Sequence, residues 1–347
     1  MTDNFIALLE KLSNAFGPPG YEDEVRKIIE NHMKHNVDEL KIDTFGNVIG
    51  IKHGKSDKTL FLAAHMDEVG LIITDIDDNG FLRFYPLGGI DARVLYAQKV
   101  VIQTKDGTKR FGYIGAKPPH IMTPEEMNKA IPMNQLFIDV GANNRDEALE
   151  LGIEIGCVAT FASSFTKLSK NKVMGKALDD RLGVAVMLQS LEQIENPEVN
   201  IVAVATVQEE VGARGARLAA WKFNPNVALI LEGTTAGDVP GVESYKQSTT
   251  QGKGPAITIA DRSMITHPKV LRALTELADK YNIPYQYKRA LVGGTDAGVI
   301  HLTREGIPSG VVSVPCRYIH SPYAIADMTD IENTIKLVTK FVLEFTF

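Results

Sequence analysis

The sequence predicts an α/β protein with a mostly parallel central sheet, helices on both faces, and a small inserted β domain. Three observations predict this fold class. Four short apolar runs have the length of strands that are buried on both faces: residues 60–64, 201–205, 227–231 and 310–314. Helical patterns lie between and around these runs. Residues from about 68 to 166 instead carry short strand-like segments separated by turn sequences.

The helices of the α/β part are predicted from amphipathic periodicity and from residues that begin helices. The N-terminal segment MTDNFIALLEKLSNAFG is typical of an amphipathic helix. Further helices are expected over about 23–35, 181–192, 268–281 and 330–345. Pro268 suits the first turn of its helix, and Asp179 and Asp180 offer hydrogen-bond acceptors just before the helix at 181. Strands that alternate with helices in this way favour parallel pairing.

The middle of the chain is predicted to form the inserted β domain. Strands are expected over 70–75, 81–85, 99–104 and 110–114, with one short helix near 145–151. The turn sequences at 77–80 and 105–107 separate them. We therefore predict an α/β domain from residues 1–67 and 167–347, and a β-rich inserted domain from residues 68–166.

Composition narrows the class of protein further. The 347 residues include 37 Lys and Arg against 43 Asp and Glu, and this net charge of −6 gives no electrostatic reason to expect a nucleic-acid or membrane partner. No stretch approaches the roughly 20 apolar residues that a membrane span needs. Two cysteines, Cys157 and Cys316, fit a reducing compartment. We therefore expect a soluble, cytoplasmic protein.

Titratable side chains follow each of the four apolar runs. His65 and Asp67 follow the first run, and Glu209 and Glu210 follow the second. Glu232 ends the third run, His320 comes after the fourth, and Asp179 stands at the start of a helix. Because the carboxyl ends of parallel strands form one rim where ligands usually bind, we expect these segments to converge on one place.

Converging carboxylates repel one another unless a positive charge lies among them. Imidazole and carboxylate groups suit zinc, cobalt or manganese and require no thiolate. Such a set can hold two divalent ions about 3.5–4 Å apart, which lower the pKa of a bridging water. Since successive side chains of a strand point in different directions, Glu209 and Glu210 can divide the work of base and ligand.

Each motif taken alone also has a structural explanation. His65 and Asp67 are often a hydrogen-bonded pair, and Asp179–Asp180 is most simply a helix N-cap. Glu209–Glu210 alone is usually a solvated pair. Their joint position at consecutive strand ends favours a site, because unrelated caps and surface acids have no reason to fall there.

These residues resemble the motif series of a known family. His65–Met66–Asp67, Asp179–Asp180, Glu209–Glu210, Glu232 and His320 are similar to the motifs of the tetrahedral, dinuclear-metal aminopeptidases, family forty-two of the metallopeptidases, which includes glutamyl and deblocking aminopeptidases. The similarity covers essentially the whole chain. It implies a zinc-peptidase-like catalytic α/β domain, an inserted domain that makes subunit contacts, and a homo-oligomer that is a tetrahedral dodecamer.

The resemblance also implies roles for individual residues. Two divalent ions, zinc or cobalt, are expected, one held by His65, Asp179 and Glu232 and the other by Asp179, Glu210 and His320. Asp179 bridges the ions and forms an unusual cis peptide with Asp180. Glu209 acts as general base and acid, and Asp67 orients the His65 imidazole. Many relatives have Asp where this chain has Glu232, so metal preference there stays open.

The activity implied by the resemblance is hydrolysis of the N-terminal peptide bond of peptides that have a free amino group. The family includes preferences for acidic, aliphatic and basic N-terminal residues, and the sequence does not choose among them. Three residues are candidates for substrate binding: Arg262, Thr295 and Asp296. Arg262 also fits a surface or ion-paired role, and Thr295 or Asp296 also fits a cap for a helix over 297–302.

Two other classes of function were weighed. A glycoside hydrolase of the endoglucanase type would use Glu209 and Glu232 as its carboxylate pair, but it has no need for His65 and His320. A non-catalytic assembly protein would keep the shell and bind metal without turnover. A full set of ligands together with Glu209 counts against that second alternative.

Overall fold

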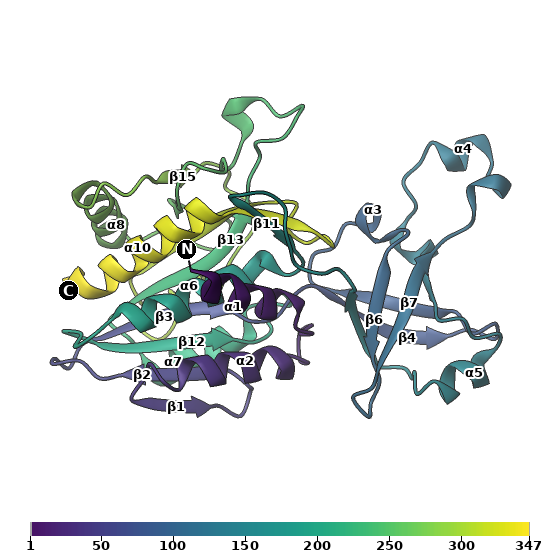
Figure 1. The fold of residues 1–347 in the computed structure, drawn as a ribbon, viewed down its shortest axis with the longest axis horizontal. Helices are drawn as coiled ribbons and strands as arrows, with labels where there is room; N and C mark the ends of the chain where they lie inside the picture. The colour runs from purple at the N-terminus through teal and green to yellow at the C-terminus, as the bar shows by residue number, and fades with distance from the viewer. Residues whose placement is uncertain (1, 347) are drawn as a thin grey trace.

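Within residues 2–346, the part of the chain that the computed structural model describes, the four apolar runs form the centre of an eleven-stranded sheet. They are β3 (Thr59–His65), β12 (Asn200–Thr206), β13 (Val227–Thr235) and β16 (Ser309–Arg317). Their order in space is β12-β3-β13-β16, and every neighbouring pair is parallel (Figure 1). The predicted α/β fold is confirmed.

Antiparallel strands extend this sheet on both sides, so the whole sheet is mixed. On one side lie β2 (Val48–Lys52) and β1 (Glu39–Ile42), and on the other lie β17 (Ala324–Asp327), β11 (Lys172–Gly175) and β10 (Thr166–Lys167). Off this path, β14 (Ala256–Thr258) pairs antiparallel with β16 and parallel with β15 (Gln286–Lys288).

Helices cover both faces of the sheet because alternate residues of each buried strand point to opposite sides. Leu60 and Leu62 of β3 pack in the core that also contains buried residues of five helices: α1 (Asp3–Asn14), α2 (Asp23–Met33), α6 (Leu178–Gln193), α8 (Pro268–Lys280) and α10 (Met328–Glu344). Phe61 and Ala63 instead pack in the core under α7 (Arg214–Phe223) and α9 (Ala297–Ile300).

The middle of the chain forms a closed six-stranded barrel beside the α/β domain (Figure 1). Its strands are β4 (Gly70–Ile76), β5 (Leu82–Leu87), β6 (Lys99–Gln103), β7 (Lys109–Gly115), β8 (Phe137–Asp139) and β9 (Val158–Phe161). Three short helices connect them: α3 (Ala92–Leu95), α4 (Pro124–Met127) and α5 (Arg145–Glu150). Four of the six strands match the predicted ones, and β8 and β9, which were not predicted, close the barrel in the order β4-β5-β8-β7-β6-β9.

A buried ionic network joins the barrel to the α/β domain. Glu68, at the start of the inserted segment, accepts hydrogen bonds from Lys176 Nζ at 2.6 Å, Gly17 N at 3.1 Å and the Arg181 guanidinium at 3.4 Å. Its other oxygen accepts a hydrogen bond from the Thr160 hydroxyl of β9 at 2.8 Å. The charged side chains of this network are at most 3% exposed, so the negative charge of Glu68 is compensated inside the protein by Lys176 and Arg181.

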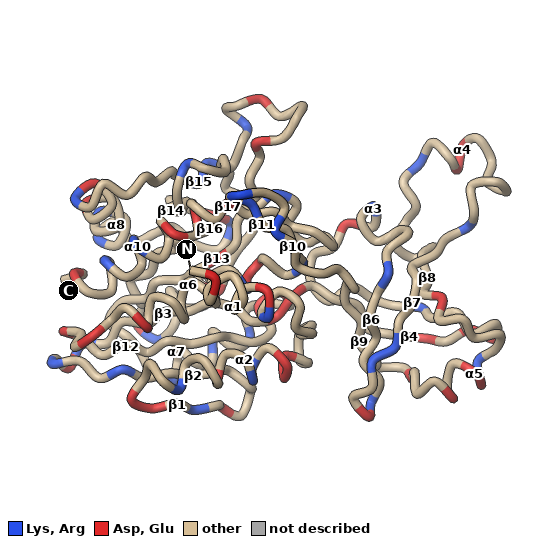
Figure 2. The backbone as a smooth tube through the Cα atoms, in the orientation of Figure 1, with Lys and Arg blue, Asp and Glu red and all other residues tan. Residues whose placement is uncertain are grey.

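Charged residues are distributed over both parts of the molecule. Figure 2 shows Lys and Arg interspersed with Asp and Glu along the barrel and the α/β domain, with basic residues most concentrated around β10 and β11. In the part of the chain described, no helix combines the length and the apolar character that a membrane crossing requires.

Candidate metal centre

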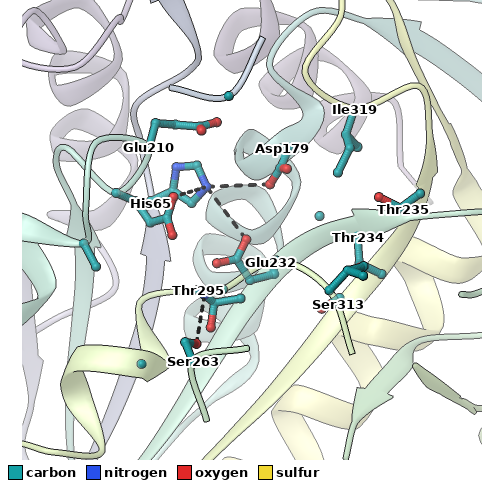
Figure 3. A pocket seen from close by; sticks show the side chains of 18 of the residues that line it. His65, Asp179, Glu210, Glu232, Thr234, Thr235, Ser263, Thr295, Ser313 and Ile319 are labelled. Carbon is teal, nitrogen blue, oxygen red and sulfur yellow. Dashed lines mark hydrogen bonds and ion pairs between the residues drawn. The ribbon is translucent and has the colours of Figure 1, made fainter. Parts of the chain in front are cut away.

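The parallel register of the central strands brings the predicted residues to one edge of the sheet. His65 ends β3 level with Thr206 of β12, and the segment that follows β12 carries Glu209 and Glu210. Glu232 lies in β13, two residues beyond the pairing of Ile230 with Ala63. Figure 3 shows the side chains of His65, Asp179, Glu210 and Glu232 gathered at this edge. His320 reaches the same cavity from the loop after β16.

His65, Asp179 and Glu232 form a first cluster of donor atoms. His65 Nε2 lies 3.6 Å from Asp179 Oδ1 and 3.7 Å from Glu232 Oε2. One ligand atom from each of the three residues lies within 4.8 Å of the others. Ligand atoms around a tetrahedral zinc ion, with bonds of about 2.1 Å, are roughly 3.4 Å apart. The spacing is therefore too long for hydrogen bonds and suits a divalent cation.

His320 and Glu210 form a second cluster around the other oxygen of Asp179. His320 Nε2 lies 3.3 Å from Asp179 Oδ2 and 3.3 Å from Glu210 Oε1. Glu210 Oε1 is buried and has no hydrogen-bond partner among residues 2–346. His320 Nδ1 lies 2.7 Å from the Gly89 carbonyl of the barrel, and as the donor it leaves Nε2 free to face the carboxylates. Asp179 thus presents one oxygen to each imidazole.

Asp67 supports both clusters through hydrogen bonds to the Glu209–Glu210 segment. It is fully buried, and its two carboxylate oxygens accept hydrogen bonds from the backbone N–H groups of Glu209 at 3.0 Å and Glu210 at 3.1 Å. Its Oδ1 also lies 3.4 Å from His65 Nδ1, a nitrogen that makes no hydrogen bond to the described residues. One carboxylate therefore positions the Glu209–Glu210 segment and faces the His65 ring.

Asp180 supports the cluster from the start of α6. The Asp179–Asp180 peptide bond is cis, as the resemblance implied. The Asp180 carboxylate is fully buried and accepts hydrogen bonds from His65 N at 3.2 Å and Gly183 N at 2.9 Å. It therefore ties the end of β3 to the first turn of the helix.

Buried carboxylates outnumber the two imidazoles in these clusters, and the pKa values of both kinds of group are shifted. Burial raises the pKa of Glu210 to about 7, and it raises the pKa values of Glu209 and Glu232 well above the usual carboxyl range. Burial lowers the pKa of His320, but the adjacent carboxylates of Asp179 and Glu210 raise it to about 10 overall. Burial would raise the pKa of Asp179, yet the adjacent imidazoles of His320 and His65 lower it. A bound cation would compensate these carboxylates.

A cavity of about 810 Å³ opens beside the two clusters. Thr295 lines it, and the Thr295 hydroxyl also accepts a hydrogen bond from Ala297 N at 3.2 Å, so both predicted roles fit the residue. Asp296 is 1% exposed, accepts a hydrogen bond from the Thr206 hydroxyl at 2.5 Å, and does not line the cavity. Arg262 is exposed and also lies outside the lining.

The lining also includes residues that were not singled out from the sequence, among them Gly89, Ser248 and Lys288. Gly89 acts through a backbone carbonyl, which carries no sequence signal. Lys288 ends a three-residue strand outside any motif. Their position at the cavity follows from the tertiary fold and not from a local sequence pattern.

Comparison with known proteins shows that the chain is similar to aminopeptidases. A "Putative aminopeptidase" of Acetivibrio thermocellus is 41% identical over 342 residues, covering 98% of this chain and 99% of that protein. Aminopeptidase APDkam598 from the archaeon Desulfurococcus kamchatkensis has a structure that superimposes with a TM-score of 0.96 at 44% identity, covering 99% of this chain and 95% of that chain.

The family follows from the same comparisons. The sequence model of the M42 glutamyl aminopeptidase family matches residues 46–337. The Pyrococcus horikoshii TET1 peptidase, which can assemble into a tetrahedron or a large octahedral shell, has a TM-score of 0.87 at 34% identity, covering 98% of this chain and 100% of that chain. The chain therefore belongs to the M42 aminopeptidase family, and the resemblance inferred from its motifs is confirmed.

Proposed function

We propose that this aminopeptidase hydrolyses the N-terminal bond of peptides at a centre of two divalent metal ions. The observation that carries the proposal is the position of Asp179 between two imidazoles, with Oδ1 toward His65 and Oδ2 toward His320. His65, Asp179 and Glu232 would hold one ion, and Asp179, Glu210 and His320 the other. Bound zinc or cobalt would supply a water of lowered pKa and would polarise the scissile carbonyl.

Glu209 is the proposed general base and acid. Its carboxylate lies 3.9 Å from His65 Nε2, and burial raises its pKa above the usual carboxyl range, which makes it a stronger proton acceptor. Glu209 would accept a proton from the attacking water and deliver it to the leaving amine. Asp67 fixes the backbone of Glu209 and so positions the carboxylate for both steps.

The proposal also covers the oligomeric state and the cellular compartment of the protein. We assign residues 1–67 and 167–347 to the catalytic domain and residues 68–166 to a domain that makes subunit contacts in a tetrahedral homo-oligomer. The assembly of the similar TET1 peptidase supports this assignment. Exposed aromatic side chains on the barrel, Tyr85, Phe111 and Tyr113, offer apolar contact area. Cys157 and Cys316 are free thiols, which fits a reducing cytoplasm.

Release of free amino acid from unblocked peptides, measured with and without a chelator, tests the function. We expect hydrolysis that a chelator abolishes and that zinc or cobalt restores. Glu209→Gln should lower kcat by about 10²–10⁴-fold while the metal content of the protein persists, because only the proton transfer is lost. Glu195→Gln, at an exposed position, is the matched control and should retain activity.

Two outcomes would contradict the proposal. Hydrolysis that survives complete metal removal would exclude the metal centre, and full activity of Glu209→Gln would exclude the assigned base. A soluble glucan included as a parallel substrate should not be cleaved. Metal binding without any peptide hydrolysis would instead support the assembly alternative.

A further inference from the structure

The loop after β16 that carries His320 has an unusual backbone. Tyr318 and His320 have φ angles of 61° and 57°, in the left-handed region that residues other than glycine rarely adopt. Ile319, between them, lines the cavity beside the candidate metal centre (Figure 3). Backbone of this kind persists only where the surrounding structure holds it. The position of His320 therefore depends on the contacts that fix this loop.

Packing against the barrel leaves a gap behind the loop. A small cavity of about 10 Å³ lies there, and its lining includes Ile319, His320 and Ser321 of the loop together with Val69 and Phe161. Such a volume is close to the minimum that holds a water molecule. Atoms that face a gap lack close packing partners on that side, so hydrogen bonds contribute more to holding the loop.

Ser163 connects the loop to the segment that returns from the barrel to the α/β domain. Its hydroxyl donates to the Pro322 carbonyl at 2.5 Å. The returning segment is itself fixed on both sides of Ser163. Ala162 N donates to a carbonyl of β6 at 3.0 Å, and Phe165 N donates to Asn14 Oδ1 at the end of α1 at 2.8 Å. Ser163 therefore acts from a segment that is anchored to both domains.

The hydrogen bond from Ser163 fixes the C-terminal end of the loop. Pro322 is buried, and a buried carbonyl that loses its donor is unfavourable. At the other end, Ser321 Oγ donates to the Tyr318 carbonyl at 2.7 Å, which closes the loop on itself. Without the Ser163 hydroxyl the closed loop would shift relative to the barrel, and the His320 ring would shift with it.

We propose that Ser163 is a positioning residue for His320. Through the Pro322 carbonyl it fixes the loop, so that His320 Nε2 faces the two carboxylates of the second cluster at 3.3 Å. This inference rests on the proposed function, which assigns that cluster to one of two metal ions. Apart from the bridging Asp179, the ligands proposed for the other ion lie on β3 and β13 and not on this loop. Loss of Ser163 should therefore weaken one ion and spare the other.

Titration of the metal-free protein with Co²⁺, followed by calorimetry and by the visible absorption of the bound ion, tests the proposal. The wild type should bind two ions per chain. Ser163→Ala should weaken one of them by about 10-fold or more, the effect of removing a group that orients a ligand, and should leave the other within about twofold. Ser163→Thr keeps the hydroxyl and should bind both ions as the wild type does. Ser164→Ala, at the exposed neighbouring position, is the control.

A double-mutant cycle shows whether Ser163 acts through His320. The His320→Ala protein should bind one ion, and adding Ser163→Ala should leave the affinity for that ion unchanged. If Ser163→Ala weakens both ions alike, or if it still weakens the ion that remains in His320→Ala, the residue supports the fold in general and the proposal is wrong.

Metal binding separates this inference from the proposed catalytic function. If Ser163→Ala selectively weakens one ion but the wild type hydrolyses no peptide, the positioning role stands and the catalytic proposal fails. If the wild type hydrolyses peptides and Ser163→Ala binds both ions with unchanged affinity, the assignment of Ser163 is wrong while the peptidase stands. A wild-type chain that binds a single ion would contradict both.

Discussion

The buried carboxyl group of Glu22 makes the stability of the folded protein depend on pH. It is 2% exposed, and its Oε1 accepts a hydrogen bond from Gly20 N at 2.8 Å. Burial raises its pKa from 4.5 to about 7, the Gly20 N–H partly offsets this, and the charge of Asp67 adds to it. Between these two pH values the folded chain keeps a proton that the unfolded chain has lost, so stability falls as pH rises.

Glu22→Gln is therefore expected to remove this pH dependence. Glutamine cannot ionise and keeps an oxygen for the Gly20 N–H, so the variant should gain roughly 3 kcal/mol over the wild type between pH 4 and pH 8. Urea unfolding across this range, at constant metal concentration, measures the difference. Glu10→Gln, exposed on α1, should follow the wild type. A constant difference between wild type and Glu22→Gln at all pH values would contradict the prediction.

At the scale of residues, the sequence identifies the side chains of the candidate centre but not the groups that hold them. His65, Glu209 and Glu232 are found because an apolar run marks where each strand ends. The Gly89 carbonyl that contacts His320 is a backbone group from another domain. Lys288 reaches the cavity only through three strand pairings that no local pattern encodes.

At the scale of elements, helix α7 packs closely against the end of β12 and so positions the segment that carries Glu209. A Cβ atom added at Gly215 would lie 2.2 Å from Asn47 Oδ1 and 2.7 Å from the Val207 carbonyl oxygen. Asn47 in turn accepts a hydrogen bond from Val207 N at 3.0 Å and donates one to the Gly215 carbonyl at 3.1 Å. The absence of a side chain at Gly215 is what lets α7 approach the end of β12 so closely.

Gly215→Ala should therefore affect both stability and catalysis. The added methyl group must displace backbone at Val207, so we expect a loss of roughly 1–3 kcal/mol in the free energy of unfolding. The same displacement moves Glu209 and should lower kcat more than it raises KM. Arg217→Ala, on the exposed face of the same helix, is the control. If the Gly215→Ala protein is less stable but its kcat is unchanged, the expected effect on the position of Glu209 is wrong.

The elements that the sequence predicts are those with strong periodicity or continuous apolar runs. The predicted helix over 268–281 and the observed α8 (Pro268–Lys280) differ by one residue. The strands that were not predicted are short, from two residues in β10 to five in β2. Such strands are stabilised by their neighbours in the barrel or sheet edge, so their own sequences carry little signal.

At the scale of the molecule, the Glu68 network is a buried link between the two domains. Glu68→Ala would leave Lys176 and Arg181 buried without their common carboxylate. We expect it to cost roughly 3–5 kcal/mol in the free energy of unfolding, measured by chemical denaturation. Lys105→Gln breaks an exposed ion pair with Glu154 and should change stability little. A Glu68→Ala protein as stable as the Lys105→Gln control would show that water or rearrangement compensates the two cations.

The contact between the Gly89 carbonyl and His320 has a consequence for protein engineering. The barrel is an insertion in sequence, yet it supplies a group that orients a candidate metal ligand of the other domain. Chimeras that carry a foreign barrel on this α/β domain should retain a well-formed centre only if the foreign barrel supplies an equivalent carbonyl and an equivalent of Glu68. Exchange of the barrel is thus constrained by one backbone oxygen in addition to the buried Glu68 network.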